Sequence, residues 1–421
     1  MKDERKYIHK RIWKARFQSL LFYICRFFPI KRKKIVFCCI EGTTGYSCNP
    51  KYIAEEFIRI NKQETDFRKR YELVWLVNDT SKIFPKEIKV VHNTLWKRAY
   101  HLTTAHFWID NSRKQLEVRK RKGQIYIQTW HAKLGFKPTC LDRGASFSKM
   151  AYLVSKHDSD MVDYWLSNSD WYDKTLKTGS LYEGKTLRTG SPRCDILVHA
   201  AEDLEFKRNI KLQICEKVQI SLDEYEKETD IDIIHFIMYA PTFRGGSQGT
   251  DRTVEVGDHF PDYEMLKSAL EERFGGKWII LLRLHPQLVA RQLDEGIGNS
   301  DIVDASKIDD MYEILAGCDA FLTDFSSAAF DAAVMRIPVF LYADDYSEYE
   351  GERGKLLWDL KDENFPFRLS INDETLKENI SGFDERDFQC KLIQLYKDTD
   401  MIETGKSAQN VVHFMKNYVS G

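Results

Sequence analysis

Short apolar runs alternate with longer segments of helical character along most of the chain. In its first half, the apolar runs predict strands at 35–40, 72–77, 88–91, 105–109, 125–130, 164–166 and 187–190. A helix is expected between the first two runs, with Asn49 as its N-cap and Pro50 as its first residue. Strands that alternate with helices predict a parallel α/β sheet.

The pattern restarts after a charged, helix-prone segment at 196–230, which we interpret as a bridge. Further strands are predicted at 233–240, 278–284, 320–323 and 339–342, and helices at 262–273, 309–317, 327–335 and 384–418. We therefore expect two α/β domains in tandem, at 35–195 and 231–383, followed by C-terminal helices at 384–421.

The N-terminal segment, residues 1–34, has a different pattern. It carries 12 Lys and Arg against two acids, a net charge of +10. Trp13, Phe17, Leu20, Ile24 and Phe27 recur at spacings of four and three, which places them on one face of a helix. The uninterrupted apolar run is too short to span a bilayer or to act as a signal peptide.

Two interpretations of this basic amphipathic helix remain open. The first is a helix that lies in the interface of an anionic membrane, with its cations on lipid headgroups. The second is a helix that packs on the protein's own core and exposes a solvated basic face. The whole chain of 421 residues has a net charge of −1, and no nucleic-acid-binding motif accompanies the basic segment, so we expect no nucleic-acid partner.

Cysteine usage favours a reduced compartment. The chain has nine cysteines, an odd number, and no CxxC pair. We expect buried thiols, without a disulfide framework or a zinc site. The sequence also lacks GxxxxGK[ST], HExxH and a convincing GxGxxG, and we predict no metal held by protein ligands.

Several predicted strands end in short polar turns, where an open parallel sheet binds its ligands. His131 follows the strand at 125–130, and a histidine at that position can act as a general base. In the first domain Arg193 follows a Gly-Ser-Pro turn and could hold an anion.

The second domain repeats this arrangement. Thr242 and Arg244 follow one strand, and Arg283 and His285 follow the next. Thr323, Asp324, Ser326 and Ser327 lie between a strand and a helix, where hydroxyls and first-turn amides could seat a phosphate. Each turn by itself has an ordinary structural interpretation as a cap, a salt bridge or a loop.

Taken in order, the turns carry a resemblance. The segments QTWHAKLGFKP, RTGSPRCDIL, MYAPTFRGG, LRLHP, LTDFSSAAFDAAVMRIPVFLY and DDYSEYEGERG, with CIEGTTGYSCNPKYIAEEF before them, are similar to the CDP-glycerol glycerophosphotransferase family of teichoic acid primases and polymerases. The similarity covers about residues 35–355. It implies two Rossmann-like domains of the glycosyltransferase-B type that face a cleft, with the acceptor in the first domain and the CDP-linked donor in the second.

The resemblance also implies a reaction and a location. An acceptor hydroxyl attacks the β-phosphate of CDP-glycerol, CMP leaves and a phosphodiester forms, at the cytoplasmic face of a bacterial membrane to which the enzyme binds peripherally. His131 matches the family's general base, and His285 matches a histidine that binds the pyrophosphate or protonates the leaving phosphate. The remaining matches are expected to bind substrate, and they are Arg193, Thr242, Arg244, Arg283, Thr323, Asp324, Ser326 and Ser327. Asp324 is also expected to orient its turn.

The sequence leaves the substrates partly open. CDP-ribitol is an alternative donor, and the acceptor is a lipid-linked saccharide or a growing wall teichoic acid or capsule polymer. Mg²⁺ could arrive bound to the donor pyrophosphate, which needs no ligand motif in the protein. Ala132 stands where many members have glycine, so the acceptor side is expected to differ from that of a standard polymerase.

Two other functions compete with this interpretation. The first is a glycosyltransferase of the same architecture that uses a CMP- or UDP-sugar in capsule or cell-surface polysaccharide synthesis. The second is a catalytically silent, membrane-bound scaffold of a polymer-assembly complex, which the altered TWHAK segment favours and the retained His131 and His285 disfavour.

Overall fold

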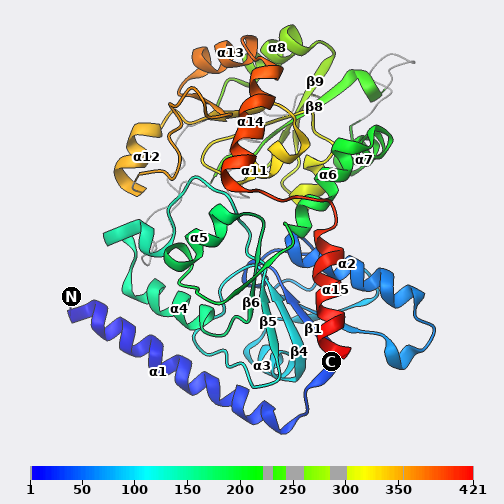
Figure 1. Ribbon diagram of the computed structural model, residues 1–421, viewed down its shortest axis with the longest axis vertical. Coiled ribbons are helices and arrows are strands. Elements are labelled where there is room, and N and C mark those ends of the chain that lie inside the picture. Colours follow the sequence, from blue (N-terminus) through cyan, green and yellow to red (C-terminus); the bar gives the residue numbers. More distant parts are fainter. Residues whose placement is uncertain (1, 221–230, 243–259, 285–300, 354, 421) are drawn as a thin grey trace. The chain divides into compact units, whose positions relative to one another are not determined.

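The computed structural model describes residues 2–220, 231–242, 260–284, 301–353 and 355–420 (Figure 1). The chain divides into two compact units. Unit 1 consists of Met1–Lys133, Thr139–Asp195 and Met401–Gly421, and unit 2 of Leu134–Pro138 and Ile196–Asp400. Each unit is built around one parallel sheet.

The sheet of unit 1 has seven strands in the order β3-β2-β1-β4-β5-β6-β7, all paired in parallel. The strands are β1 (Lys31–Cys38), β2 (Glu72–Val77), β3 (Ile88–His92), β4 (Ala105–Asp110), β5 (Ile125–Gln128), β6 (Tyr164–Ser167) and β7 (Lys185–Arg188). Its helices are α1 (Lys2–Ile24), α2 (Cys48–Gln63), α3 (Leu95–Thr104), α4 (Lys149–Ser159), α5 (Asp170–Gly179) and α15 (Ser407–Ser420).

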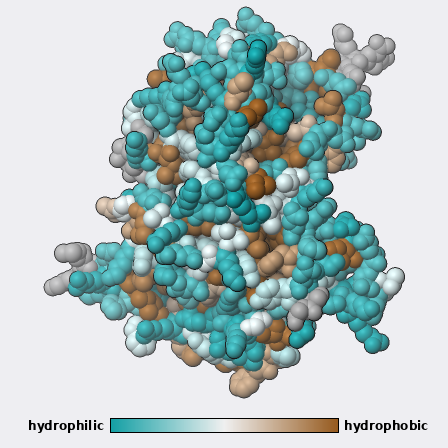
Figure 2. Space-filling model, viewed as in Figure 1, coloured by the Kyte–Doolittle hydropathy of each residue, from teal (hydrophilic) through white to brown (hydrophobic). Residues whose placement is uncertain are grey.

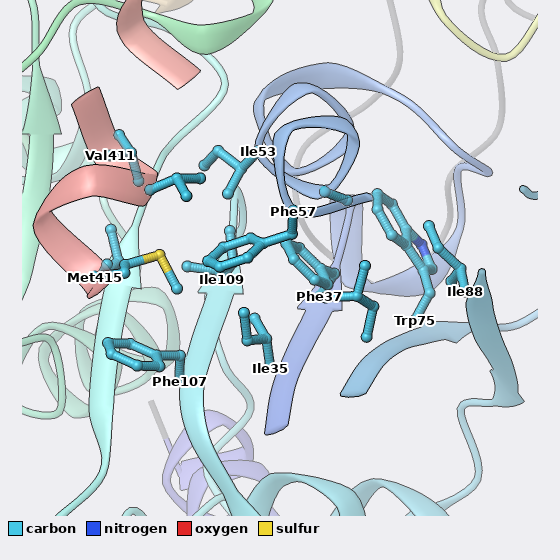
Figure 3. Packing of buried hydrophobic residues seen from close by; sticks show 14 of the residues in the cluster. Ile35, Phe37, Ile53, Phe57, Trp75, Ile88, Phe107, Ile109, Val411 and Met415 are labelled. Atoms are coloured by element: carbon cyan, nitrogen blue, oxygen red, sulfur yellow. The ribbon is translucent and has the colours of Figure 1, made fainter. Parts of the chain in front are cut away.

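Both faces of this sheet are buried, which explains why its central strands read as continuous apolar runs. Alternate residues of β1 point to opposite faces. Ile35 and Phe37 belong to a cluster with Phe57 of α2 and Met415 of α15 (Figure 3). Val36 and Cys38 belong to a second cluster, on the other face, that includes residues of α1 and α3.

The sheet of unit 2 has six parallel strands in the order β10-β9-β8-β11-β12-β13. They are β8 (Ile234–Tyr239), β9 (Lys277–Leu282), β10 (Ile302–Asp304), β11 (Ala320–Thr323), β12 (Val339–Tyr342) and β13 (Arg368–Ser370). The helices from the boundary onward are α6 (Asp195–Glu202), α7 (Leu204–Val218), α8 (Tyr263–Phe274), α10 (Met311–Leu315), α11 (Ala328–Ala332), α12 (Tyr346–Arg353), α13 (Asp373–Ser381) and α14 (Glu385–Thr399).

The strands that the apolar runs predict are confirmed in both sheets, with ends that differ by a few residues. Two strands escaped prediction, β10 and β13, because each has three residues and a polar end. The helical stretch expected at 384–418 consists of the two helices α14 and α15. Asp400 adopts a left-handed φ of 49° after α14, and α15 begins at Ser407.

A short segment of unit 2 comes from the first half of the chain. Phe136 lies within Leu134–Pro138, and its ring centroid is 4.9 Å from that of Phe330. Its carbonyl accepts a hydrogen bond from the amide of Leu357 at 2.8 Å, and Phe365 and Phe367 pack around the ring. Phe136 is fully buried and therefore completes the core of unit 2.

Helix α1 has two opposite apolar stripes. Ile8, Ala15 and Phe22 are buried against unit 1, whereas the stripe predicted from the sequence is exposed, from 48% at Ile24 to 91% at Phe27 just beyond the helix. At 100° per residue the two stripes lie about 160° apart. The helix does pack on the core, but not through the predicted stripe. Among the described residues, no helix is long and apolar enough to cross a membrane.

The basic run at 31–34 is the start of strand β1 and not a separate segment. Lys34 is only 1% exposed. Its Nζ donates to Thr104 Oγ1 at 2.7 Å and lies 5.0 Å from the centre of the Tyr100 ring. Burial lowers the pKa of the Lys34 ammonium from 10.5 to about 8. This cation therefore opposes folding at neutral pH and is unavailable to a membrane surface.

We expect a Lys34→Met substitution to stabilise unit 1 at pH 7 by about 1–3 kcal/mol, since the ammonium is less favourable when buried than when solvated in the unfolded chain. Because the folded pKa is depressed, the wild-type protein should gain stability between about pH 8 and pH 10.5. The difference between the two proteins should shrink over that range. Urea unfolding at a series of pH values measures both, and a pH-independent difference would contradict the expectation.

Candidate active site

In both sheets the strand order reverses between two central strands, β1 and β4 in unit 1 and β8 and β11 in unit 2. Loops that leave the carboxyl ends of such strands diverge to opposite faces and leave room for a ligand. Of the predicted site residues that the structure describes, all but Arg193 lie at the end of one of these strands or of an adjacent strand, and Arg193 follows the edge strand β7.

In unit 1, buried side chains satisfy the backbone that emerges from β1 and β4. Asn111 is fully buried, and its Oδ1 accepts from the amide of Ile40 at 2.8 Å. Ser112 Oγ accepts from the amide of Glu41 at 2.8 Å. Ile40 and Glu41 have left-handed φ values of 43° and 57°. Such conformations persist where surrounding bonds overdetermine them, as they do here.

His131 is bonded to the same corner. Its Nδ1 lies 2.9 Å from the carbonyl oxygen of Asn111. A carbonyl can only accept, so Nδ1 carries the proton and Nε2 carries the lone pair of the neutral ring. The side chain is accessible to solvent, and a substrate atom could reach it. The geometry supports a ring oriented for general-base chemistry through Nε2.

The surroundings of His131 disfavour the imidazolium. His131 is exposed, but nearby protein displaces part of the water around its ring, and this loss of water lowers its pKa from 6.5 to about 4. The hydrogen bond to the Asn111 carbonyl opposes this effect, and the positive charges of Arg193, Arg113 and Lys133, each with a weaker influence than that bond, lower the pKa further. His131 is therefore neutral at physiological pH, which is the state that a base requires.

The residue before His131 is strained. Trp130 has a left-handed φ of 47°, and its amide donates to Gln128 Oε1 at 3.0 Å. The centroid of the Trp130 ring is 4.6 Å from that of His131. The Arg113 guanidinium also contacts the Trp130 ring, 4.8 Å from its centre. The turn is thus held by a hydrogen bond to the Trp130 backbone and by packing of the Trp130 ring.

Arg193 is buried in the turn Pro192–Cys194, within reach of the same histidine. Its Nη1 donates to the carbonyl of His131 and lies 3.6 Å from Cys48 Sγ. The sequence predicts an anion-binding arginine here. The structure places its cation beside His131 and also gives it a role in holding the backbone of that residue.

In unit 2, Asp324 joins the ends of β8 and β11. Its carboxylate accepts from the amide of Thr242 at 2.9 and 3.0 Å and from the Thr242 hydroxyl at 2.8 Å. Thr323 is fully buried, and its hydroxyl donates to the carbonyl of Ala240 at 2.6 Å. The hydroxyls of both threonines are therefore donors within the protein, and Asp324 ties the segment after β8 to the end of β11.

Ser326 and Ser327 lie half-buried before α11, a helix of only five residues. Ser326 Oγ accepts from the amide of Ala328 at 3.3 Å. The predicted helix at 327–335 continues beyond Ala332 as a 3-10 turn, so the dipole at this position is weaker than a long helix would supply.

The guanidinium of Arg283 donates hydrogen bonds to backbone carbonyls of its own unit. Nη1 donates to the carbonyls of Ala305, Ser306 and Ile308, and Nη2 donates to that of Asp309 at 3.3 Å. These bonds hold the segment after β10 against β9. The other two predicted residues, Arg244 and His285, lie outside the described residues. In the part of the chain that is described, no group of three or more His, Cys, Asp or Glu could hold a metal ion.

Two residues of this site escaped sequence reasoning, Asn49 and Asn111. Asn49 was expected to cap α2, but the helix begins at Cys48, and Ser47 occupies the N-cap position. The Asn49 side chain instead bonds the backbone at Thr129, Trp130 and Arg193. Asn111 directly follows β4, and Asn49 lies in the first turn of α2. Asparagines are common near the ends of strands and helices, so the sequence does not mark these two, and only the fold brings them to His131.

We expect His131 to titrate well below the ordinary histidine pKa of 6.5. The ring should stay neutral on acidification to about pH 5, because surrounding protein and neighbouring cations disfavour its charged form. NMR of protein with ¹³C-labelled histidine rings measures this, with the signal assigned from its loss in His131→Gln. A midpoint between pH 6 and pH 7 would contradict the electrostatic account of the site.

Comparison with known proteins agrees with this geometry. The family described as CDP-Glycerol:Poly(glycerophosphate) glycerophosphotransferase matches residues 20–417. The chain is 26% identical to a teichoic acid poly(glycerol phosphate) polymerase of Staphylococcus epidermidis over 91% of its own length and 50% of that protein's. It is 26% identical to a teichoic acid glycerol-phosphate transferase of Staphylococcus aureus, with coverage of 87% and 88%. The chain thus spans about half the length of some curated relatives that it matches.

Among solved structures, the wall teichoic acid polymerase TagF is similar, with a TM-score of 0.76, 23% identity, and coverage of 99% of this chain and 97% of that one. This likeness establishes the fold, and the prediction of a glycosyltransferase-B type architecture with two parallel sheets is confirmed. With the family match over nearly the whole described sequence, the chain belongs to the CDP-Glycerol:Poly(glycerophosphate) glycerophosphotransferase family.

Proposed function

We propose that this protein transfers glycerol phosphate from CDP-glycerol to a hydroxyl of a lipid-linked saccharide or a growing teichoic acid or capsule polymer. The acceptor oxygen forms a bond to the β-phosphorus, the bond between that phosphorus and the bridging oxygen breaks, and CMP leaves. Membership of the family and a neutral, oriented His131 support this reaction.

His131 is the general base of the proposed reaction. Nδ1 donates to the Asn111 carbonyl, so Nε2 is the atom that takes the proton of the acceptor hydroxyl as the new bond forms. Phosphoryl transfer depends chiefly on positioning and charge stabilisation. The Arg193 cation lies beside His131, where it can stabilise negative charge on the transferred phosphate.

The remaining predicted residues have supporting roles in this proposal. Thr242, Asp324 and Thr323 hold the ends of β8 and β11 in place, and the half-buried Ser326 and Ser327 hydroxyls are the ones available to phosphate oxygens. Arg244 and His285 stay predictions for binding of the nucleotide and the pyrophosphate. Mg²⁺ carried by the donor also stays a prediction, which assays with EDTA and with added Mg²⁺ would test.

The reaction is tested by CMP release from purified protein, offered CDP-glycerol or CDP-ribitol with a lipid-linked saccharide. We expect release with CDP-glycerol and a fall of about 10²–10⁴-fold in His131→Gln, which removes the base. His157→Gln is the matched control, because His157 also bonds a backbone carbonyl, that of Val118, at 3.0 Å. Its activity should stay within about twofold of wild type.

Other outcomes would redirect the proposal. Release with CDP-ribitol alone would change the donor and keep the chemistry. Turnover of a CMP- or UDP-sugar without release from either CDP-polyol would establish the glycosyltransferase alternative. Equal activity in wild type and His131→Gln would remove His131 as the base.

We also propose that α1 attaches the protein peripherally to the cytoplasmic face of an anionic membrane. The stripe formed by Trp13, Phe17, Leu20, Ile24 and Phe27 is exposed and is not used by the core. Figure 2 shows brown apolar residues among teal ones along the edge where α1 lies. Aromatic side chains flanked by Lys and Arg suit the boundary between headgroups and acyl chains. This location would bring the active site to a lipid-linked acceptor.

Sedimentation with vesicles tests the attachment. We expect wild-type protein to bind vesicles that contain phosphatidylglycerol, and a Trp13→Glu, Phe17→Glu double variant to lose at least tenfold in affinity, because two exposed apolar contacts are replaced by repelling charges. Ile83→Glu is the control, since Ile83 is 89% exposed outside α1. Equal binding by the double variant and the control would contradict a role for this stripe.

A further inference from the structure

Asn49 bonds the backbone on both sides of His131, and these bonds distinguish it from a helix cap. It is in the first turn of α2 and is 1% exposed. We propose that Asn49 is a positioning residue, which fixes the backbone on which His131 acts. The proposal rests on the proposed function in one respect, the role of His131 as base.

The amide of Asn49 joins three segments of unit 1. Nδ2 donates to the carbonyl of Trp130 at 2.7 Å and to that of Thr129 at 3.3 Å. Oδ1 accepts from the backbone amide of Arg193 at 3.0 Å. The side chain thus uses both of its donor hydrogens and its acceptor oxygen on backbone groups next to His131 and Arg193.

These bonds fix His131 from both sides of its peptide backbone. Asn49 holds the carbonyl of Trp130, which belongs to the peptide unit that precedes His131. Arg193 holds the carbonyl of His131 itself, and Asn49 holds the amide of Arg193. The ring is then fixed by its bond to the Asn111 carbonyl. Asn49 is therefore common to both restraints on the backbone of His131.

The strain of the turn makes this restraint consequential. Trp130 has a left-handed φ of 47°, which costs of order 1–3 kcal/mol without compensating bonds. Loss of the Asn49 amide would leave the Trp130 carbonyl without this partner and let the turn relax toward an extended backbone. A displacement of about 1 Å at a catalytic group can cost 10²-fold in rate. Relaxation would therefore appear in catalysis before it appears in folding.

A second asparagine of the same helix provides a matched control. Asn61 also bridges backbone groups, with Nδ2 donating to the Tyr71 carbonyl at 3.0 Å and Oδ1 accepting from the Tyr71 amide at 2.8 Å. It lies three turns along α2 from Asn49 and bonds none of the residues of the site. Substitution of either residue removes a bridge from α2 to neighbouring backbone, but only one bridge leads to His131.

The first experiment compares kcat and KM in Asn49→Ala, Asn49→Ser and Asn61→Ala, assayed as CMP release well below the unfolding midpoint of each protein. We expect kcat to fall about 100-fold in Asn49→Ala with little change in KM for the acceptor, and to stay within about twofold in Asn61→Ala. Asn49→Ser serves if the alanine variant fails to fold. An unchanged kcat in the Asn49 variants, or an equal fall in Asn61→Ala, would overturn the proposal.

The second experiment needs no substrate and separates this proposal from the proposed function. NMR titration of the ¹³C-labelled ring should show the His131 midpoint rise toward 6.5 in Asn49→Ala, as the ring leaves its packed environment, and stay at the wild-type value in Asn61→Ala. An unmoved signal in Asn49→Ala would overturn positioning. If wild type releases no CMP but the signal moves, the proposed reaction fails and the positioning of His131 by Asn49 stands.

Discussion

The site depends on the need to satisfy backbone groups where the strands of a parallel sheet end. Beyond their last ladder bonds, β1, β4 and β5 leave amides and carbonyls in partly buried positions, and an unpaired polar group costs up to about 1–3 kcal/mol where it is buried. Side chains of Asn111, Ser112, Gln128 and Asn49 provide the missing partners. The backbone conformations that result are strained, and they present His131. In unit 2, Asp324 meets the same need between β8 and β11.

The sequence was a good guide to the elements and a weaker one to the contacts. Fully buried strands are apolar runs with polar ends, so the central strands and the turns after them could be located, whereas β10 and β13 are too short to stand out. His131 was singled out because its segment, QTWHAKLGFKP, resembles the family, whereas a histidine after a strand has an ordinary structural interpretation by itself. Arg283 shows the limit, because its position after β9 suggests ligand binding while its guanidinium serves four carbonyls.

The N-terminal helix shows a second limit, which is geometric. A period of 3.6 residues identifies a stripe but not its partner. Helix α1 has two stripes, and the more aromatic one, with Trp13 and Phe17, faces outward. The core uses Ile8, Ala15 and Phe22, which are smaller or more widely spaced in the sequence. Charge counting has a similar limit. Lys34 contributes to the basic segment in the sequence, but in the fold its side chain is buried against α3.

The placement of Leu134–Pro138 in unit 2 has a consequence for how the protein can be divided. Because residues 1–133, 139–195 and 401–421 make up unit 1, the chain crosses between units at four points. A fragment that begins at Ile196 would lack Phe136 and expose Phe330, Phe365 and Phe367, which pack around it. Neither unit is a continuous stretch of chain, so a gene fragment cut at any single point encodes an incomplete core. An exchange of one unit between relatives would therefore have to transfer all the segments of that unit together.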